Sequence, residues 1–174
     1  MPLERLWTAW RSAYVHSIAE TRLETGPDGR TLFERILAAE GSDADKHLVR
    51  RGAHCFVLLN KFPYTSGHLL VLPNRGEPDL EGLDPAEHEE LWSLVRASVV
   101  AIKSAFGCDG VNVGLNLGAA AGGSQSDHLH VHCVPRWVGD ANFIGIAAET
   151  RVLPVSLDEA YERLVEAWPS GVVS

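Results

Sequence analysis

Three histidines alternate with apolar residues in the segment His128-Leu129-His130-Val131-His132-Cys133-Val134. A period of two residues is that of a β-strand, so the imidazoles are expected on one face at intervals of about 6.7 Å, with the apolar side chains on the other. Charged imidazoles this close repel one another, so at least one ring should be neutral near neutral pH and able to act as nucleophile or base. The segment, which we expect Pro135 to end, predicts a sheet with an apolar face and a reactive or anion-binding face.

A second alternating segment, residues 111–117, precedes the histidines, and a glycine-rich loop, residues 118–127, joins the two. Asn112, Gly114 and Asn116 share one face of this segment. The glycines of the loop permit backbone N–H groups to point at an anion, although a turn of this composition more often only joins two strands. The loop therefore counts as a phosphate cradle only in combination with the histidines and asparagines beside it. The other face, expected in the core, carries Val111, Val113, Leu115 and Leu117.

The rest of the chain predicts strands and helices in irregular alternation. Residues 54–59 and 67–72 are apolar runs separated by a short turn, which favours two adjacent antiparallel strands. Asp84-Pro85-Ala86-Glu87 supplies an N-cap, a proline at the first helical position and a carboxylate at the third, and predicts a helix of about 22 residues. Because a helix does not follow every strand, we expect an α+β domain with an antiparallel sheet. Further amphipathic helices are expected at residues 3–18, at 31–39 and from Ser156, the last with Leu157, Tyr161, Leu164, Val165 and Trp168 facing inward.

Composition and charge narrow the classes of protein. A chain of 174 residues with 45% hydrophobic and 22% charged residues is typical of one folded domain. The net charge of -8 argues against a partner held by many phosphate contacts, such as duplex nucleic acid. No stretch approaches the roughly 20 apolar residues of a membrane span, and the first residues do not resemble a signal peptide. Cys55, Cys108 and Cys133 are widely spaced, which favours reduced thiols, so we expect a cytoplasmic protein without a nucleic-acid or membrane partner.

The three imidazoles beside the glycine-rich loop predict transfer at phosphorus through a covalent intermediate. A neutral ring would attack the α-phosphorus of a nucleotide, while the neighbouring imidazoles, amides and loop N–H groups offset charge on the oxygens. His130 is the natural nucleophile because it alone has a histidine on each side. Two other interpretations stay open, a zinc site formed by alternate histidines and a stripe of purely structural histidines.

The same residues resemble the histidine triad (HIT) superfamily of nucleotide hydrolases and transferases. Residues 128–134 match its His-φ-His-φ-His-φ-φ signature, and the similarity covers roughly residues 50–155. Asn60 with Pro63, residues 67–73 and residues 112–116 fall where that family has its nucleoside and phosphate segments. Residues 6–11, 114–118 and 135–143 are similar to the bacterial branch that includes diadenosine tetraphosphate phosphorylases.

The resemblance implies a role for each matching position. His130 would form the nucleotidyl-histidine intermediate, with His132 near the α-phosphate and the leaving group, and His128 and His68 would orient these rings. Four further positions would contact the nucleotide. They are Asn60 at the ribose, Asn116 and Ser124 on the phosphate side, and Gly123, which would let the loop backbone approach.

The resemblance also implies an architecture. We expect a five-stranded antiparallel sheet with a long helix and flanking N- and C-terminal helices, in a chain that forms a symmetric homodimer. The single HIT domain would span residues 1–174, with an N-terminal helical extension at 1–50, the core at 51–155 and the C-terminal helix at 156–174. Thr31-Leu32-Phe33-Glu34 stands where many relatives carry a Cys-x-x-Cys zinc motif, so no structural zinc is implied.

The predicted activity is cleavage of diadenosine polyphosphates, most simply phosphorolysis of diadenosine tetraphosphate. A dinucleoside polyphosphate hydrolase and an adenosine phosphoramidase are enzymatic alternatives, because water and an amine-bearing leaving group suit the same intermediate. A nucleotide-binding sensor without turnover is an alternative of another class. We expect a small nucleotide substrate and no tightly bound cofactor or metal, although a divalent cation could accompany the polyphosphate.

Overall fold

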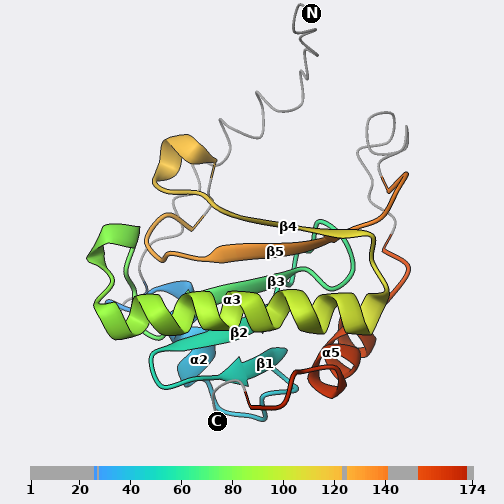
Figure 1. Cartoon of the computed structure of the whole chain (residues 1–174). Helices are drawn as coiled ribbons and strands as arrows, with labels where there is room; N and C mark the ends of the chain where they lie inside the picture. The colour runs from blue at the N-terminus through green and yellow to red at the C-terminus, as the bar shows by residue number, and fades with distance from the viewer. Residues whose placement is uncertain (1–25, 27, 123–124, 141–152, 172–174) are drawn as a thin grey trace, which may run out of the picture.

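The computed structural model describes residues 26, 28–122, 125–140 and 153–171, which include a five-stranded sheet in the order β1-β2-β3-β5-β4 (Figure 1). Every neighbouring pair of strands is antiparallel. The predicted α+β class with an antiparallel sheet and a long helix is therefore confirmed. The strands are β1 (Leu48–Arg51), β2 (Cys55–Leu59), β3 (Leu69–Pro73), β4 (Gly110–Leu115) and β5 (Val131–Arg136); the helices are α2 (Leu32–Ala38), α3 (Pro85–Phe106) and α5 (Leu157–Glu166).

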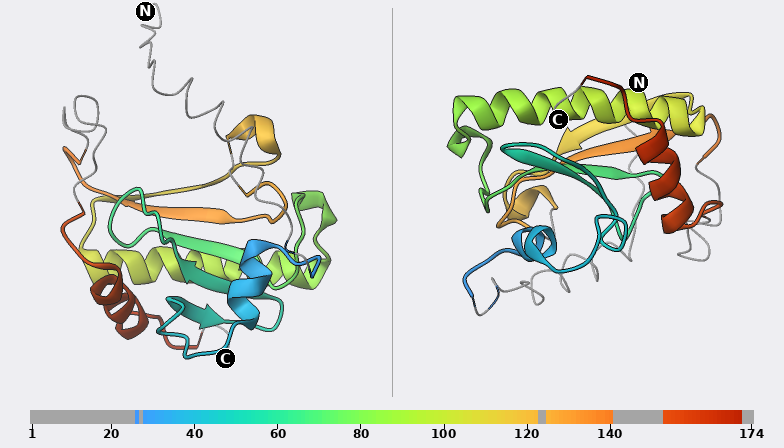
Figure 2. Two further views of the ribbon diagram at one scale, coloured as in Figure 1. Left: turned by 180° about the vertical axis from the view of Figure 1, so that it is seen from behind. Right: turned by 90° about the horizontal axis from the view of Figure 1, so that it is seen from below.

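The sheet lies between two layers of helix. Helix α3 runs across one face with α5 beside it, and α2 lies on the opposite face (Figure 2). Strands β2 and β3 are buried on both faces, which explains their nearly continuous apolar sequence. Their side chains divide by parity between two cores. The α3 side includes Val57, Leu59, Leu69 and Val71, and the α2 side contains Phe33, Leu48, Phe56, Leu58, Leu70 and Leu72.

Helix α3 begins and ends where the sequence predicts. The Asp84 side chain accepts a hydrogen bond from the N–H of Glu87, whose carboxylate accepts the N–H of Asp84, and Pro85 opens the helix. The helix ends at Gly107, whose φ of 56° is in the left-handed region that glycine adopts at low cost. The expected inward stripe of Leu91, Leu94, Val95 and Ile102 is buried, whereas Val99 is only half-buried.

The strand that carries the histidines differs from the expectation at both ends. It begins at Val131, so His128 and His130 precede it, and it continues through Pro135 to Arg136. A proline is tolerated there because pairing with β3 ends at Cys133, and the Pro135 carbonyl accepts the hydroxyl of Thr65 from a loop instead. The prediction that Pro135 ends the strand is therefore wrong.

The edge strands account for two further differences. Strand β1 was not predicted, since it has only four residues and half of them are arginine. Strand β4 ends at Leu115, and the side chains of Val113 and Leu117, expected in the core, are 43% and 41% exposed. Among the described residues β4 pairs only with β5, and the apolar side chain of Val113 on this strand is exposed.

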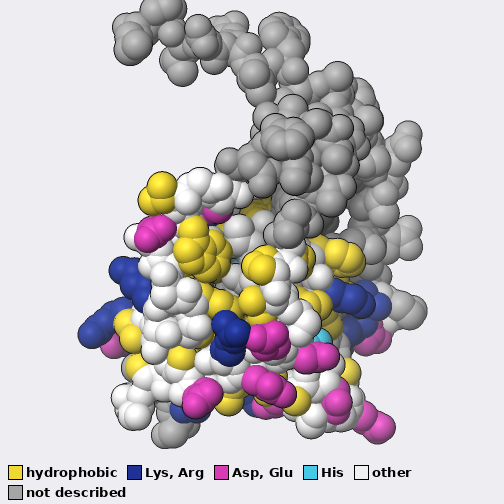
Figure 3. Space-filling view, turned by 90° about the vertical axis from the view of Figure 1, so that its right-hand side faces the viewer, with side chains coloured by type: hydrophobic (Ala, Val, Ile, Leu, Met, Phe, Trp, Pro, Cys, Tyr) yellow, Lys and Arg dark blue, Asp and Glu magenta, His cyan; other side chains and the backbone are white. Residues whose placement is uncertain are grey.

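Helix α5 is capped by Ser156, as predicted, but the second half of the expected capping box is absent. The hydroxyl of Ser156 accepts the N–H of Glu159, while the Glu159 carboxylate bonds Arg163 instead of reaching back. Leu164 is buried as expected, whereas Val165 is 44% exposed. The end of the molecule where α5 lies shows a gathering of acidic side chains (Figure 3). The exposed acids of this helix are Asp158, Glu159, Glu162 and Glu166.

Two predicted segments lie outside the described residues, namely the helix at 3–18 and the end of the C-terminal segment at 172–174. The described part of that C-terminal segment is helical only to Glu166. No helix within the described ranges is both long enough and apolar enough to cross a membrane.

Candidate active site

Four histidines from two segments of the chain meet on the α2 face of the sheet. Register places His132 of β5 opposite Leu70 of β3 and Gly114 of β4. The ring centroid of His132 lies 4.8 Å from that of His130 and 5.2 Å from that of His68, which directly precedes β3. His68, His128 and His130 are buried, and His132 is half-buried. The residues that alternation predicted to share a face are therefore brought together, although only His132 lies within the strand itself.

The ring of His128 is held at both nitrogens. Its Nε2 lies 2.9 Å from the carbonyl oxygen of Pro73, which can only accept, so this nitrogen carries a proton. Its Nδ1 lies 2.7 Å from the hydroxyl of Thr31, the N-cap residue of α2. In the neutral ring Nδ1 is an acceptor, so the Thr31 hydroxyl donates to it.

His130 is fixed by the residue two positions before it. Its Nδ1 lies 2.8 Å from the carbonyl oxygen of His128, so Nδ1 carries the proton of the neutral ring. The lone pair is therefore on Nε2, for which no hydrogen bond occurs among the described residues. A neutral imidazole with a free lone pair is a nucleophile, and its orientation is set by the backbone that carries His128.

The tautomers of His68 and His132 follow from a backbone donor. The N–H of Tyr64 donates to Nδ1 of His68 at 3.2 Å, and the side-chain amide of Asn60 reaches the same nitrogen at 3.2 Å. Nε2 of His68 then carries the proton and donates to Nδ1 of His132 at 3.0 Å. His132 is left with its proton on Nε2, a buried atom for which no described residue supplies an acceptor. A buried N–H without a partner is expensive, which suggests that a ligand oxygen completes it.

Burial keeps the triad neutral. Desolvation lowers the pKa of His128 and His130 below the usual histidine value, although carbonyl hydrogen bonds and the Asp127 carboxylate act in the opposite direction. Desolvation, together with the neighbouring His130, lowers the pKa of His132 to about 4. At neutral pH the site therefore presents a lone pair on His130 and an N–H on His132, which suits nucleophilic attack assisted by a hydrogen bond to the oxygen on which charge develops.

Comparisons with known proteins agree with this geometry. The model of the HIT domain matches residues 42–138, more than half of the chain. The chain belongs to the HIT family. It is 40% identical over 170 residues to the AP-4-A phosphorylase of Mycobacterium tuberculosis strain H37Rv, an alignment that covers 95% of this chain and 85% of that protein.

More distant members of the HIT family match smaller parts. The asymmetrical bis(5'-nucleosyl)-tetraphosphatase of Schizosaccharomyces pombe is 37% identical over 82 residues, covering 47% of this chain and 44% of the relative. A histidine triad nucleotide-binding protein of Sulfolobus tokodaii has a similar structure, with a TM-score of 0.61 and 27% identity over 78% of this chain and 89% of its own. A zinc-bound family member of Mycobacterium smegmatis gives a TM-score of 0.58 and 27% identity, covering 70% and 82%.

The predicted nucleotide contacts lie at different distances from the HIT triad. Asn60 is beside His68, and its Oδ1 accepts the N–H of Phe62. Asn116 directly follows β4, one residue beyond the Leu115–Val131 pair that ends the β4–β5 ladder. Gly123 and Ser124 lie outside the described residues.

Two residues near the expected phosphate segments do not reach the triad. Asn112 accepts a hydrogen bond from Arg136, and the Arg136 guanidinium also pairs with Asp140. Arg136 pairs with Gly110 at the far end of the β4–β5 ladder. This end of the sheet is therefore tied together by its own ion pair.

Three residues at the triad escaped the sequence analysis. Thr31 bonds His128, and the ring of Phe33 lies 5.4 Å from that of His128 and 5.5 Å from that of His130. Tyr64 stacks on His132 at 5.9 Å and an interplanar angle of 20°. The resemblance to the HIT family implies a zinc motif in many members at the position of Thr31 and Phe33, and this could have pointed to these two residues but not to Tyr64.

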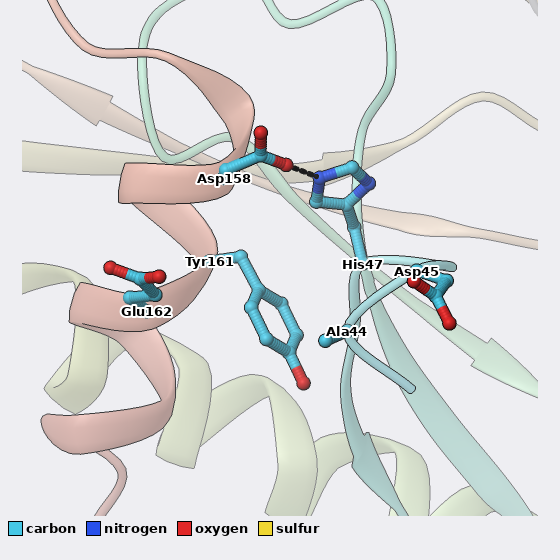
Figure 4. Close-up of a pocket in the computed structure, with 6 residues that line it drawn as sticks. All are labelled: Ala44, Asp45, His47, Asp158, Tyr161 and Glu162. Atoms are coloured by element: carbon cyan, nitrogen blue, oxygen red, sulfur yellow. Dashed lines mark hydrogen bonds and ion pairs between the residues drawn. The ribbon is translucent and has the colours of Figure 1, made fainter. Parts of the chain in front are cut away.

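One surface pocket lies away from the triad. It is lined by residues of the loop before β1 and by α5, and Nε2–H of His47 donates to the Asp158 carboxylate at 2.8 Å beside the ring of Tyr161 (Figure 4). His47 has a φ of 53°, an uncommon value for a residue other than glycine. Within the described ranges no three His, Cys, Asp or Glu side chains are grouped so as to hold a metal ion.

Proposed function

We propose that this HIT protein transfers a nucleotidyl group from a diadenosine polyphosphate to inorganic phosphate, with diadenosine tetraphosphate as the preferred substrate. The similarity to the AP-4-A phosphorylase over 95% of the chain supports the substrate and the acceptor. The observation that carries the chemistry is the tautomer of His130, whose Nδ1 proton is held by the His128 carbonyl so that Nε2 is free to attack.

The reaction has two halves. First, Nε2 of His130 forms a bond to the α-phosphorus while the bond from that phosphorus to the bridging oxygen breaks, which releases ATP from diadenosine tetraphosphate. The Nε2–H of His132 hydrogen-bonds the oxygen on which negative charge develops. Second, an oxygen of inorganic phosphate attacks the same phosphorus and the bond to His130 breaks, which gives ADP and restores the neutral ring.

The remaining site residues keep their expected roles within this proposal. His68 and His128 orient the reacting rings through the hydrogen bonds described above. Asn60 contacts the ribose with the second hydrogen of its amide, and the roles on the phosphate side fall to Asn116, Gly123 and Ser124. A divalent cation bound with the polyphosphate would offset part of its charge.

Product analysis with and without inorganic phosphate tests the proposal. ATP and ADP that appear only when phosphate is present support a phosphorylase. AMP release without phosphate would instead indicate a hydrolase, the activity in the name of the Schizosaccharomyces pombe relative. Stable binding of the substrate without products would indicate a sensor, faster cleavage of an adenosine phosphoramidate would indicate a phosphoramidase, and activity lost on chelation and restored by zinc would indicate a metalloenzyme.

We also propose a homodimer and a reducing compartment, namely the cytoplasm. The edge of β4 that pairs with no other described strand, and the exposed side chain of Val113, offer a second copy a strand to pair with and an apolar surface to cover. The cysteines Cys55, Cys108 and Cys133 are free. Sedimentation of the full chain at several concentrations tests the dimer, and fractionation of the cells that express it tests the compartment.

A further inference from the structure

The first turn of α2 touches the triad at its least accessible ring. Thr31 is 6% exposed and His128 is 1% exposed, and the two are 97 residues apart in the sequence. Neither partner can exchange this hydrogen bond for one to water without opening the structure. A buried polar contact of this kind fixes the orientation of both groups.

The Thr31 hydroxyl is itself oriented. Its oxygen accepts the N–H of Glu34 at 3.3 Å, while the Glu34 carboxylate accepts the N–H of Thr31 at 2.8 Å. With one lone pair occupied in this way, the hydroxyl hydrogen is available to the acceptor nitrogen of His128. The capping box therefore does more than begin a helix, because it aims a donor at the triad.

The same turn is tied to the loop that holds the other side of His128. The second oxygen of Glu34 accepts the N–H of Gly76 at 2.9 Å, three residues after Pro73. The contact is so close that a Cβ on Gly76 would lie 2.6 Å from Cγ2 of Thr31. Further along the same loop, the carbonyl of Glu77 accepts the N–H of Leu129 at 2.6 Å. The turn, the loop and the segment that begins at His128 thus form one connected unit.

We propose that Thr31 is a positioning residue for the reaction, acting through His128 on the nucleophile His130. The inference rests on the proposed function and deepens it. The hydroxyl donates to Nδ1 of His128, Nε2 of His128 donates to Pro73, and the carbonyl of His128 accepts Nδ1–H of His130. Loss of the first bond frees the His128 ring and the backbone that sets the direction of the His130 lone pair. Phe33 packs against both rings and limits their rotation.

Three charged or titratable groups act on His128 besides the hydroxyl. Glu34 of α2 and Asp127 of its own segment favour its protonation, whereas His130 opposes it. Thr31 opposes it as well, because the donated bond stabilises the neutral ring. Removal of the hydroxyl should therefore raise the pH midpoint at which His128 gains a proton.

Three substitutions at Thr31 separate the hydroxyl from the helix cap. Thr31→Ser keeps both the cap and the donor. Thr31→Asp keeps a side-chain oxygen as cap but offers a carboxylate, which draws a proton onto His128 instead of donating one. Thr31→Ala removes both. Ser156→Ala is the matched control, because it removes the equivalent cap of α5 at a distance from the triad.

Steady-state kinetics are the first readout. We expect kcat to fall by roughly ten- to hundredfold in Thr31→Ala and Thr31→Asp, with little change in KM, and to be retained in Thr31→Ser and Ser156→Ala. The acid limb of the pH profile of kcat should move to higher pH in the two impaired variants. Retained kcat in Thr31→Ala, or an equal loss in Ser156→Ala, would overturn the assignment.

Nitrogen NMR of histidine-labelled protein is the second readout and needs no activity. In the parent, His128 should show an unprotonated Nδ1 and a protonated Nε2 at neutral pH. The pH midpoint of His128 protonation should rise in Thr31→Ala, rise further in Thr31→Asp and stay at the parental value in Thr31→Ser. If the parent proves inactive on every substrate while this pattern holds, the proposed function fails and the Thr31–His128 link stands. An unchanged midpoint in all variants would overturn the link itself.

Discussion

The α3 face and the opposite face of the sheet both bury titratable side chains. The two faces differ in how much of the hydrogen-bonding capacity of these side chains is used. The carboxylate of Glu87 pairs with both Nε and Nη2 of Arg75, which holds the pKa of Glu87 below its usual range. The Glu90 carboxylate accepts the N–H groups of Ala53, His54 and Cys55 and so ties α3 to the hairpin between β1 and β2. Every described contact of these two side chains is structural, and little hydrogen-bonding capacity remains.

The face of the sheet that carries the triad shows the opposite behaviour to the α3 face. The three histidines of the triad are neutral; His128 has both nitrogens hydrogen-bonded to the protein, whereas His130 and His132 each have only one bonded within the described part of the chain. Nε2 of His130 and Nε2–H of His132 are left over, one an acceptor and the other a donor. Burial alone therefore does not mark a functional group, whereas burial with unused hydrogen-bonding capacity does.

The largest expected effect is on the triad face. His130→Asn should lower kcat by about 10⁴-fold or more because the nucleophile is gone, while nucleotide affinity and thermal stability change little. Rate measurements under saturating substrate, with isothermal titration for affinity, provide the check. Turnover near the parental rate would break the assignment of this face as the reactive one.

On the α3 face the expected loss is of stability. Glu90→Ala leaves three N–H groups without their acceptor and should lower the free energy of unfolding by about 2–4 kcal/mol, with kcat of the folded enzyme unchanged. Urea denaturation measures the change. Glu89→Ala, an exposed carboxylate on the same helix, is the control and should cost less than about 0.5 kcal/mol. Equal effects of the two substitutions would contradict the structural role.

As the pH falls, buried groups on the two faces should reduce the free energy of unfolding in different pH ranges. The pKa of His132 is about 4 in the folded chain against 6.5 as its ordinary value, so the unfolded chain binds the proton first. The free energy of unfolding should therefore fall as pH drops from about 6.5 to about 4, by up to about 3 kcal/mol from this residue, with His128 and His130 acting in the same direction. Protonation of Glu87 should also lower the free energy of unfolding, but only below pH 4.5, the ordinary pKa of a glutamate.

Urea unfolding at a series of pH values checks this separation. His132→Gln should flatten the dependence between pH 4 and pH 6.5 and leave the steeper loss below it. A parental curve that is flat across this interval would mean that the triad is not held neutral by burial.

The smallest expected effect concerns the N-terminal cap of α5. Ser156→Ala should lower the free energy of unfolding by about 1 kcal/mol, because it removes the N-cap of α5. Activity should stay intact, because this cap bonds a residue of α5 and not a residue of the triad. Calorimetry with parallel activity assays measures both quantities. Lost activity in this variant would show that the two faces are coupled through the C-terminal helix.

Local patterns predicted what depends on near neighbours. Asp84, Pro85 and Glu87 specify the start of α3 within four residues, and alternation placed His130 and His132 side by side. The short strand β1 carries no such pattern, because its arginines interrupt the apolar run, and among the described strands it pairs only with β2. Strand β5 likewise passes Pro135 because of a loop hydroxyl that the local sequence does not reveal.

The candidate site was predictable only in part for the same reason. The triad lies in one segment, but the bonds that fix its tautomers come from distant positions, Thr31 on α2 and Pro73 at the end of β3. Such contacts depend on how the layers pack. The free nitrogens of the histidines could therefore be assigned only after the fold had been established.

Mass spectrometry of the trapped intermediate would show directly whether His130 is the nucleophile. The enzyme is mixed with diadenosine tetraphosphate without inorganic phosphate, quenched in alkali to preserve a phosphorus–nitrogen bond, and digested. We expect an adenylyl group on the peptide that contains His130, lost on addition of phosphate and absent from His130→Asn. An adduct on another residue, or a parent enzyme that turns over while no adduct forms in repeated trials, would contradict the account.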